Sequence, residues 1–260
     1  MQGILTGETA LNLWYVATVA IVGLAIVAGI ASGYFKARKC QPRGFKWKQF
    51  RFEAMMMVIT FAFGAIVMGN LQKWLVANEW ITFKNEPAAW WVILLEYAAY
   101  FITFDTWFYW LHRWMHNEPY YSWIHKLHHK STSPNLITTF SVHPFESLIN
   151  GGWMIIFVTV VDVHSASMAL IVPTNVIMGL WVHSGYEFLP KWWNRTWVTK
   201  WFISATFHDH HHKYFTANFG GYTTVWDRLC GTVHKRFEGD FVKIKERPLR
   251  EPAPEAVAAE

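Results

Sequence analysis

The stretch Asp105-Thr-Trp-Phe-Tyr-Trp-Leu-His112-Arg-Trp-Met-His116 carries an apolar run directly into two histidines four positions apart. Residues i and i+4 of a helix share a face, so both imidazoles can approach one point from the last turn of that run. Imidazole binds zinc, iron, copper and nickel, whereas the hard oxygen-binding cations prefer carboxylates. The stretch therefore predicts a membrane helix that ends in half of a transition-metal site.

Two further histidine clusters follow with helical spacing. Each places imidazoles at i, i+3 and i+4, which a helix brings to one side. Eight imidazoles exceed the four to six ligands that one ion takes, so we predict two metal ions. In the last cluster His210 turns away from the shared face. The clusters are His125-Lys-Leu-His128-His129 and His208-Asp-His210-His211-His212.

The composition indicates a membrane protein rather than a soluble one. Of the 260 residues 53% are hydrophobic and 16% charged, against about 25% charged in typical globular proteins. A span needs about 20 apolar residues. A fourth apolar region is too long for one span and is interrupted at 161–164 and at Pro173, which predicts a helical hairpin. The three predicted spans are 11–35, 52–76 and 88–111, and the hairpin is 148–182.

Charge gives the orientation. The loop at 36–51 carries seven Lys or Arg residues and no acid, so the positive-inside rule places it in the cytoplasm. All three histidine clusters then fall on the cytoplasmic side, as does His183 at the return of the hairpin, a candidate ninth ligand. The formal charge of +5 fits a membrane surface, and we expect no nucleic-acid partner. The predicted fold is an all-α integral membrane protein of about four to five membrane helices with a cytoplasmic helical cap.

Several other residues are weaker candidates for the site. His143 is a possible further ligand, with a supporting role as the alternative. Asp105 lies two helical turns before His112, where it either accepts a hydrogen bond from an imidazole or pairs with Arg113. No Glu-x-x-His pair appears, which excludes the carboxylate-bridged di-iron bundle, and no nucleotide-binding Gly motif appears. Four more carboxylates either support the ligands or are ordinary interface residues: Glu146, Glu187, Asp209 and Asp227.

In the order of these clusters the chain resembles the fatty acid hydroxylase / sterol desaturase superfamily over roughly residues 95 to 235. Secondary signatures add to the likeness. The motifs are closest to sterol C4-methyl oxidase-like members, although those typically carry Asp where this chain has Glu187. Fatty acid 2-hydroxylases often place a further His at that position. The secondary signatures are His143-Pro-Phe-Glu146, His183-Ser-Gly-Tyr-Glu187, Asn218-Phe-Gly220 and Trp226-Asp227-Arg228.

The resemblance implies a specific chemistry. It implies two non-haem iron ions, activation of O2, a lipid substrate, and electrons from NAD(P)H through a separate carrier protein. It also implies the endoplasmic reticulum or a bacterial inner membrane. Support for the ligands would come from Asp105, Glu146, Glu187, Asn218 and Asp227. The implied metal ligands and catalytic residues are His112, His116, His125, His128, His129, His183, His208, His211 and His212.

Several alternatives stay open. The product is an alcohol or, after a second hydrogen abstraction, an alkene, and the lipid is sterol-like or a fatty acyl chain. Zinc can replace iron in purified protein, because imidazole sites accept both. The rival functions are a zinc-dependent membrane hydrolase and a metal-handling membrane protein. An apolar slot for the lipid would be lined by aromatic residues such as Trp107 and Trp114, whose alternative role is plain packing.

The predicted organisation has three parts. N-terminal membrane helices occupy residues 1–90, and the catalytic domain, including the hairpin, occupies 91–240. Residues 241–260 form a C-terminal tail, of which the last ten are rich in Pro, Ala and Glu and are expected to be disordered.

Overall fold

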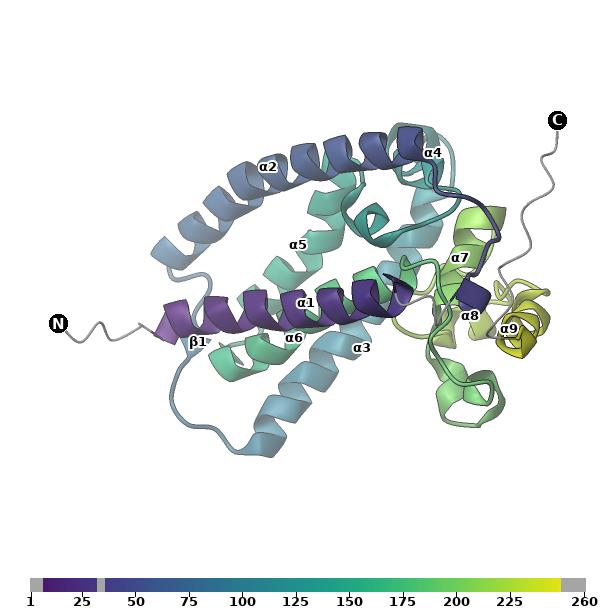
Figure 1. Ribbon diagram of the computed structural model, residues 1–260. Coiled ribbons are helices and arrows are strands. Elements are labelled where there is room, and N and C mark those ends of the chain that lie inside the picture. Colours follow the sequence, from purple (N-terminus) through teal and green to yellow (C-terminus); the bar gives the residue numbers. More distant parts are fainter. Residues whose placement is uncertain (1–6, 32–35, 249–260) are drawn as a thin grey trace.

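The computed structural model describes residues 7–31 and 36–248, and nearly all of its regular secondary structure is helical. Five long helices run through the body of the molecule, and the short helices gather at one end (Figure 1). The long helices are α1 (Gly7–Ala31), α2 (Trp47–Ala77), α3 (Trp90–Met115), α5 (Pro144–Val160) and α6 (Ser165–Val182). The short helices are α4 (Tyr120–Trp123), α7 (Ala205–Tyr214), α8 (Val225–Leu229) and α9 (Phe237–Glu246).

Five 3₁₀ turns and two short strands complete the described part of the chain. The cap is defined here as residues 116–143 and 183–248, which lie at the end where the short helices gather. The turns are η1 (Lys36–Arg38), η2 (His125–Lys130), η3 (Leu136–Phe140), η4 (Trp193–Arg195) and η5 (Thr199–Trp201), and the strands are β1 (Phe83–Lys84) and β2 (Val163–His164).

Three helices are long and apolar enough to cross a membrane: α1 from Leu13 to Ala31, all of α2, and α6. No residue between Leu13 and Ala31 is buried, so the apolar surface of α1 points outward, as lipid contact requires. The 17-residue α5 is apolar but shorter, and α3 carries Glu96, Asp105 and Arg113. The predicted all-α membrane fold is confirmed, with the hairpin formed by α5 and α6. The last four residues of the first predicted span lie outside the described residues.

The hairpin has one break where the sequence predicted two. The chain turns at 161–164 as expected, but Pro173 lies inside α6, which stays helical from Ser165 to Val182. Proline has no N–H to donate to the carbonyl four residues earlier, here that of Ala169. The indole Nε1 of Trp14 on α1 donates to that carbonyl oxygen at 3.1 Å. A neighbouring helix therefore satisfies the group that the proline leaves free, and the helix continues.

The two connections at the end opposite the cap are joined to each other. Strand β1 pairs in parallel with β2, with Phe83 opposite Val163. Glu96 of α3 accepts from the backbone N and from Nδ1 of His164, at 3.0 and 2.8 Å. The α2–α3 and α5–α6 connections thus lie at one end, as the alternation of the predicted spans requires.

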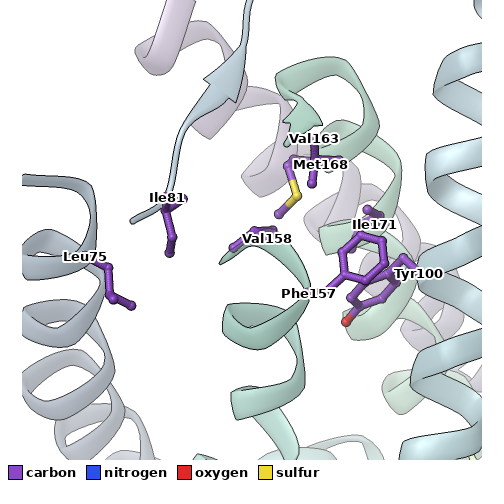
Figure 2. Packing of buried hydrophobic residues seen from close by; sticks show 8 residues of the cluster. All are labelled: Leu75, Ile81, Tyr100, Phe157, Val158, Val163, Met168 and Ile171. Carbon is purple, nitrogen blue, oxygen red and sulfur yellow. The ribbon is translucent and has the colours of Figure 1, made fainter. Parts of the chain in front are cut away.

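A hydrophobic core lies between the long helices near that end (Figure 2). Tyr100 of α3 meets Phe157 of α5 edge to face, with ring centroids 5.2 Å apart. The burial of such apolar groups holds α3 against the hairpin. The buried members are Leu75, Ile81, Tyr100, Phe157, Val158, Val163, Met168 and Ile171.

The cap has a separate core and is tied to the N-terminal segment. Phe207 of α7 packs edge to face on Phe237 of α9 at 5.1 Å. Helix α9 continues past residue 240, where the sequence placed the start of a tail, because Phe241 and Ile244 are buried in the cap. Arg38 donates to the carbonyl oxygen of Ile244 at 2.8 Å. The predicted disordered tail from 251 lies outside the described residues.

Candidate metal centre

Nine histidines converge where the long helices meet the cap. They come from four places: the end of α3, the turn η2, the end of α6, and α7. Their side-chain nitrogens fall into two groups, in each of which the atoms lie within 4.8 Å of one another. The first group is His112, His116, His125, His129 and His211, and the second group is His128, His183, His208 and His212.

Local structure places these histidines. Helix α3 runs one turn beyond the predicted span, so His112 lies in its last turn and His116 caps it. Ser204 caps the N-terminus of α7, because its Oγ accepts from the Phe207 N–H at 3.2 Å. His208 and His211 lie three positions apart on α7, so their side chains share a face of the helix and both point into the centre.

In the first group all five Nε2 atoms point at one another. Nε2 of His125 lies 3.0 Å from that of His112 and 2.9 Å from that of His129. Nε2 of His211 lies 3.0 Å from that of His129 and 3.2 Å from that of His116. Nitrogens bound to one ion at about 2.1 Å, with angles of about 90–109°, lie roughly 3.0–3.4 Å apart. The spacing therefore fits ligands of a single ion.

The second group has the same character. Nε2 of His183 lies 3.3 Å from that of His128 and 2.9 Å from that of His208. Nε2 of His212 lies 3.2 Å from that of His208. The groups are neighbours, since the rings of His129 and His212 have centroids 4.9 Å apart. The donor set therefore fits two ions side by side.

The opposite ring nitrogens fix the orientation of five of the rings. Nδ1 of His125 lies 2.9 Å from Oε1 of Glu146. In the other four the Nδ1 atom faces a backbone carbonyl oxygen, which can only accept a hydrogen bond, so Nδ1 is the donor and carries the proton. A proton on Nδ1 leaves Nε2 free to bind metal. The pairs are His112 with Phe219 at 2.8 Å, His211 with Ala217 at 2.8 Å, His128 with Ser141 at 3.2 Å and His183 with Gly179 at 2.9 Å.

The surroundings keep the imidazoles neutral. Burial lowers the pKa of His128 to about 4. Burial and the neighbouring His128 lower the pKa of His183 to about 3. The pKa values of His125, His208 and His211 fall well below the usual range for the same reasons, burial first. Metal binding requires neutral imidazole, and the protein supplies it at neutral pH.

Three predicted supporting residues contact the centre or its frame. Glu146 binds His125 as described. Asp227 accepts from the N–H groups of Phe219 and Gly220 at 2.9 and 2.7 Å, and so holds the peptide whose carbonyl binds His112. Asn218 donates to the carbonyl of Phe207 in α7 at 2.9 Å.

Two predicted carboxylates have a different role. Asp105 contacts neither an imidazole nor Arg113. It accepts from the N–H groups of Tyr222 and Thr223, each at 2.9 Å, because that loop lies against α3 with its N–H groups inward. Glu187 accepts from the Thr206 N–H at 3.0 Å at the start of α7, where free N–H groups favour an anion.

The remaining histidines lie outside both groups. His143, the weaker predicted ligand, caps α5 by accepting from the Phe145 N–H at 3.2 Å and belongs to neither group. His210 turns away from the centre, as its spacing predicts, and its Nε2 lies 3.4 Å from Asp240.

One important residue was missed. Glu53 on α2 is completely buried and accepts from Ser131 Oγ and Asn135 Nδ2 at 2.5 Å and from Thr138 Oγ1 at 3.0 Å. It thereby anchors the segment that follows η2. The only feature of the sequence that could have indicated this role is the position of Glu53 at the edge of a predicted span. The backbone carbonyl groups that bind the histidines cannot be recognised from side-chain patterns.

A cavity opens on the first group from the cap surface. Its volume is about 460 Å³. Of the nine histidines only His116 is not buried, and it lines this cavity. The other lining residues are Arg113, Asn117, Tyr121, Phe215, Thr216, Phe219 and Thr232.

Helices long and apolar enough to cross a membrane, together with nine imidazoles that converge beside the cap, define a helical membrane protein with a histidine-rich candidate metal centre. Residues 97–232 match the family model described as Fatty acid hydroxylase. The chain belongs to the fatty acid hydroxylase family, as its resemblance indicated. The predicted oxidoreductase agrees with the description of this family.

Among its relatives, methylsterol monooxygenase 1 of Gallus gallus is 32% identical over 176 residues, or 68% of this chain and 55% of the relative. Methylsterol monooxygenase 1 of Danio rerio is 36% identical over 157 residues, or 60% of this chain and 52% of the relative. Methylsterol monooxygenase 1 of Rattus norvegicus is 33% identical over 143 residues, or 55% of this chain and 48% of the relative. The chain spans about half the length of the curated relatives it matches. No solved structure matches the chain.

Proposed function

We propose that this protein oxidises a C–H bond of a membrane lipid, with O2 as oxidant and two iron ions held by the two histidine groups. The observation that carries the proposal is the pair of groups, five and four imidazoles, with convergent Nε2 atoms. When bound, the iron ions would supply the activation of O2 that attack on an unactivated C–H bond needs. Zinc would fit the same donors in purified protein.

The chain's own residues prepare this centre. Glu146 and four carbonyl oxygens hold Nδ1–H groups and so keep five imidazoles oriented before metal binds. The same contacts make the ligating nitrogens more basic. Burial of all ligands except His116 keeps bulk water from the reacting atoms.

We assign a sterol-like lipid as the substrate. The relatives are methylsterol monooxygenases, and the motifs around His183 and His208 are closest to that group. A fatty acyl chain is the alternative. Hydroxylation is the simplest outcome, and desaturation would use the same first hydrogen abstraction.

The centre should face the cytoplasm, of the endoplasmic reticulum or of a bacterial inner membrane. The basic segment 36–51 lies at the cap end, because the Cys40 N–H donates to the Gly185 carbonyl at 2.9 Å, two residues after His183. Positive loops face the cytoplasm. Labelling a Lys235→Cys variant with an impermeant maleimide in sealed vesicles of known orientation tests this.

Electrons from NAD(P)H should arrive through a separate carrier protein at the cavity beside His116. That imidazole is the ligand nearest solvent. A Thr216→Trp variant would fill the cavity, since Thr216 lines it and is exposed. We expect reduction by the carrier to slow, with reduction by dithionite and metal content unchanged. Equal rates with the carrier would contradict this assignment.

The function is tested with iron-loaded protein in lipid nanodiscs, a methylsterol, reduced carrier and ¹⁸O2. Incorporation of ¹⁸O into the lipid indicates hydroxylation, and O2-dependent loss of two hydrogens without ¹⁸O indicates desaturation. His128→Ala should abolish either product, whereas His143→Ala, outside both groups, should not. A product formed without O2 or reductant would support the hydrolase instead, and metal transport without any product would support metal handling.

A further inference from the structure

Helices α3 and α5 meet along one seam that ends at the first histidine group. Glu146, Asn150 and Trp153 occupy positions i, i+4 and i+7 of α5 and so share a face. The ring of Trp153 stacks on that of Trp107 of α3, with centroids 5.3 Å apart and planes at 25°. These four residues are called the α3–α5 seam.

Each residue of the seam holds a buried polar atom without a hydrogen-bond partner among the described residues. Two are indole donors, Nε1 of Trp107 and of Trp153. Two are acceptors, Oδ1 of Asn150 and Oε2 of Glu146, whose other oxygen faces His125. Nearly all buried polar groups in proteins are paired, because leaving one unpaired is costly. Between apolar helices, bulk water does not pair them.

We propose that the α3–α5 seam binds a hydroxyl group of the lipid substrate, an inference that rests on the proposed function. A hydroxyl both donates and accepts hydrogen bonds. It can accept from an indole N–H and donate to the Asn150 amide oxygen or to Glu146. A methylene can do neither, and a ketone can only accept. The mixture of donors and acceptors therefore selects an alcohol.

The seam also places this hydroxyl close to the metal centre. Oε1 of Glu146 lies 2.9 Å from Nδ1 of His125, a member of the first group. Asn150 follows Glu146 by one helical turn, about 6 Å along the axis. The ring of His125 lies between the seam, which meets its Nδ1, and the other ligands, which meet its Nε2. The seam therefore favours a lipid that carries a hydroxyl group over one that presents only a hydrocarbon chain there.

Binding decides the proposal without turnover. The probes are a methylsterol and the same sterol lacking its hydroxyl, measured by equilibrium binding to metal-loaded protein in nanodiscs. We expect the wild type to prefer the alcohol by roughly 2- to 10-fold, the effect of one net hydrogen bond. Asn150→Leu, of similar volume, should abolish the preference and leave binding of the deoxy sterol nearly unchanged. Trp153→Phe, which keeps the ring and removes the donor, should reduce the preference.

Trp193→Phe is the matched control. Trp193 also has a buried Nε1 without a partner among the described residues, but it packs in the cap core. The Trp193→Phe variant should keep the wild-type preference for the sterol that carries the hydroxyl. No preference in the wild type, or a full preference in both seam variants with normal metal content, would overturn the proposal. Absence of O2-dependent product from any lipid would count against the proposed function alone, because the binding measurement stands without it.

Discussion

Two neighbouring residues offer a sharp test of the two histidine groups. His211 and His212 are adjacent on α7 and completely buried, yet they belong to different groups. His210 precedes them, is also buried, and faces Asp240 instead. His211→Ala and His212→Ala should each release one of the two ions, and His210→Ala should release neither.

The two variants should lose different amounts of metal affinity. Without His211 the first group keeps four of its five imidazoles, and without His212 the second keeps three of four. Removing a residue that only orients a ligand typically weakens binding about 10- to 100-fold. Removing a ligand itself should exceed that range, and His212→Ala should cost more affinity than His211→Ala.

The assay is metal per chain by mass spectrometry after gel filtration over a series of chelator concentrations, with circular dichroism to verify the helices. Wild type and His210→Ala should hold two ions at chelator concentrations where the other variants hold one. Two ions retained by both His211→Ala and His212→Ala, or a loss in His210→Ala alone, would refute the division into two groups.

Three further predictions follow from contacts around the centre. Glu146→Leu removes the oxygen that faces Nδ1 of His125 and should weaken the binding of one ion about 10- to 100-fold by chelator competition; unchanged affinity would contradict the contact. Glu53→Ala leaves the buried hydroxyls of Ser131 and Thr138 and the half-buried amides of Asn135 and Gln49 without this acceptor, which should lower the unfolding free energy by about 2–6 kcal/mol; exposed Glu79→Ala is the control in a thermal unfolding experiment. The pKa of His128 is lowered to about 4, so its neutral, metal-binding form persists as the pH falls below the usual 6.5. Bound metal should therefore remain at pH 5.5 and be released only as the pH approaches about 4, and half-release near pH 6.5 in equilibrium dialysis would show that burial does not protect the site.

Much of the fold and site was predictable because it depends on local periodicity. Helical spacing and the ends of apolar runs brought the three clusters to one end, and the hairpin topology added His183 to them. These patterns need only the geometry of a helix and the thickness of a membrane. The convergence of the nine residues appears in the structure, while their binding of metal stays a prediction.

The rest depends on contacts between segments far apart in the chain. Spacing cannot show that His128 joins the second group while His125 and His129 join the first. Nor can it show that Trp14 satisfies the carbonyl freed by Pro173. Asp105 lay on the expected helix, but the loop that packs there decided its partners. Backbone acceptors such as the Phe219 carbonyl are invisible in side-chain patterns.

The anchor at Glu53 has a consequence for how the protein can be divided. The family match covers residues 97–232, yet the segment after η2 is held by a carboxylate on α2, far outside that range. Arg38, still earlier in the chain, holds α9. The matched region therefore depends on residues before it: a fragment or chimera that starts near residue 90 would carry every histidine but would lack Glu53 and Arg38, which hold the segments around them. A chimera between two relatives should therefore take the N-terminal helices and the histidine groups from the same protein.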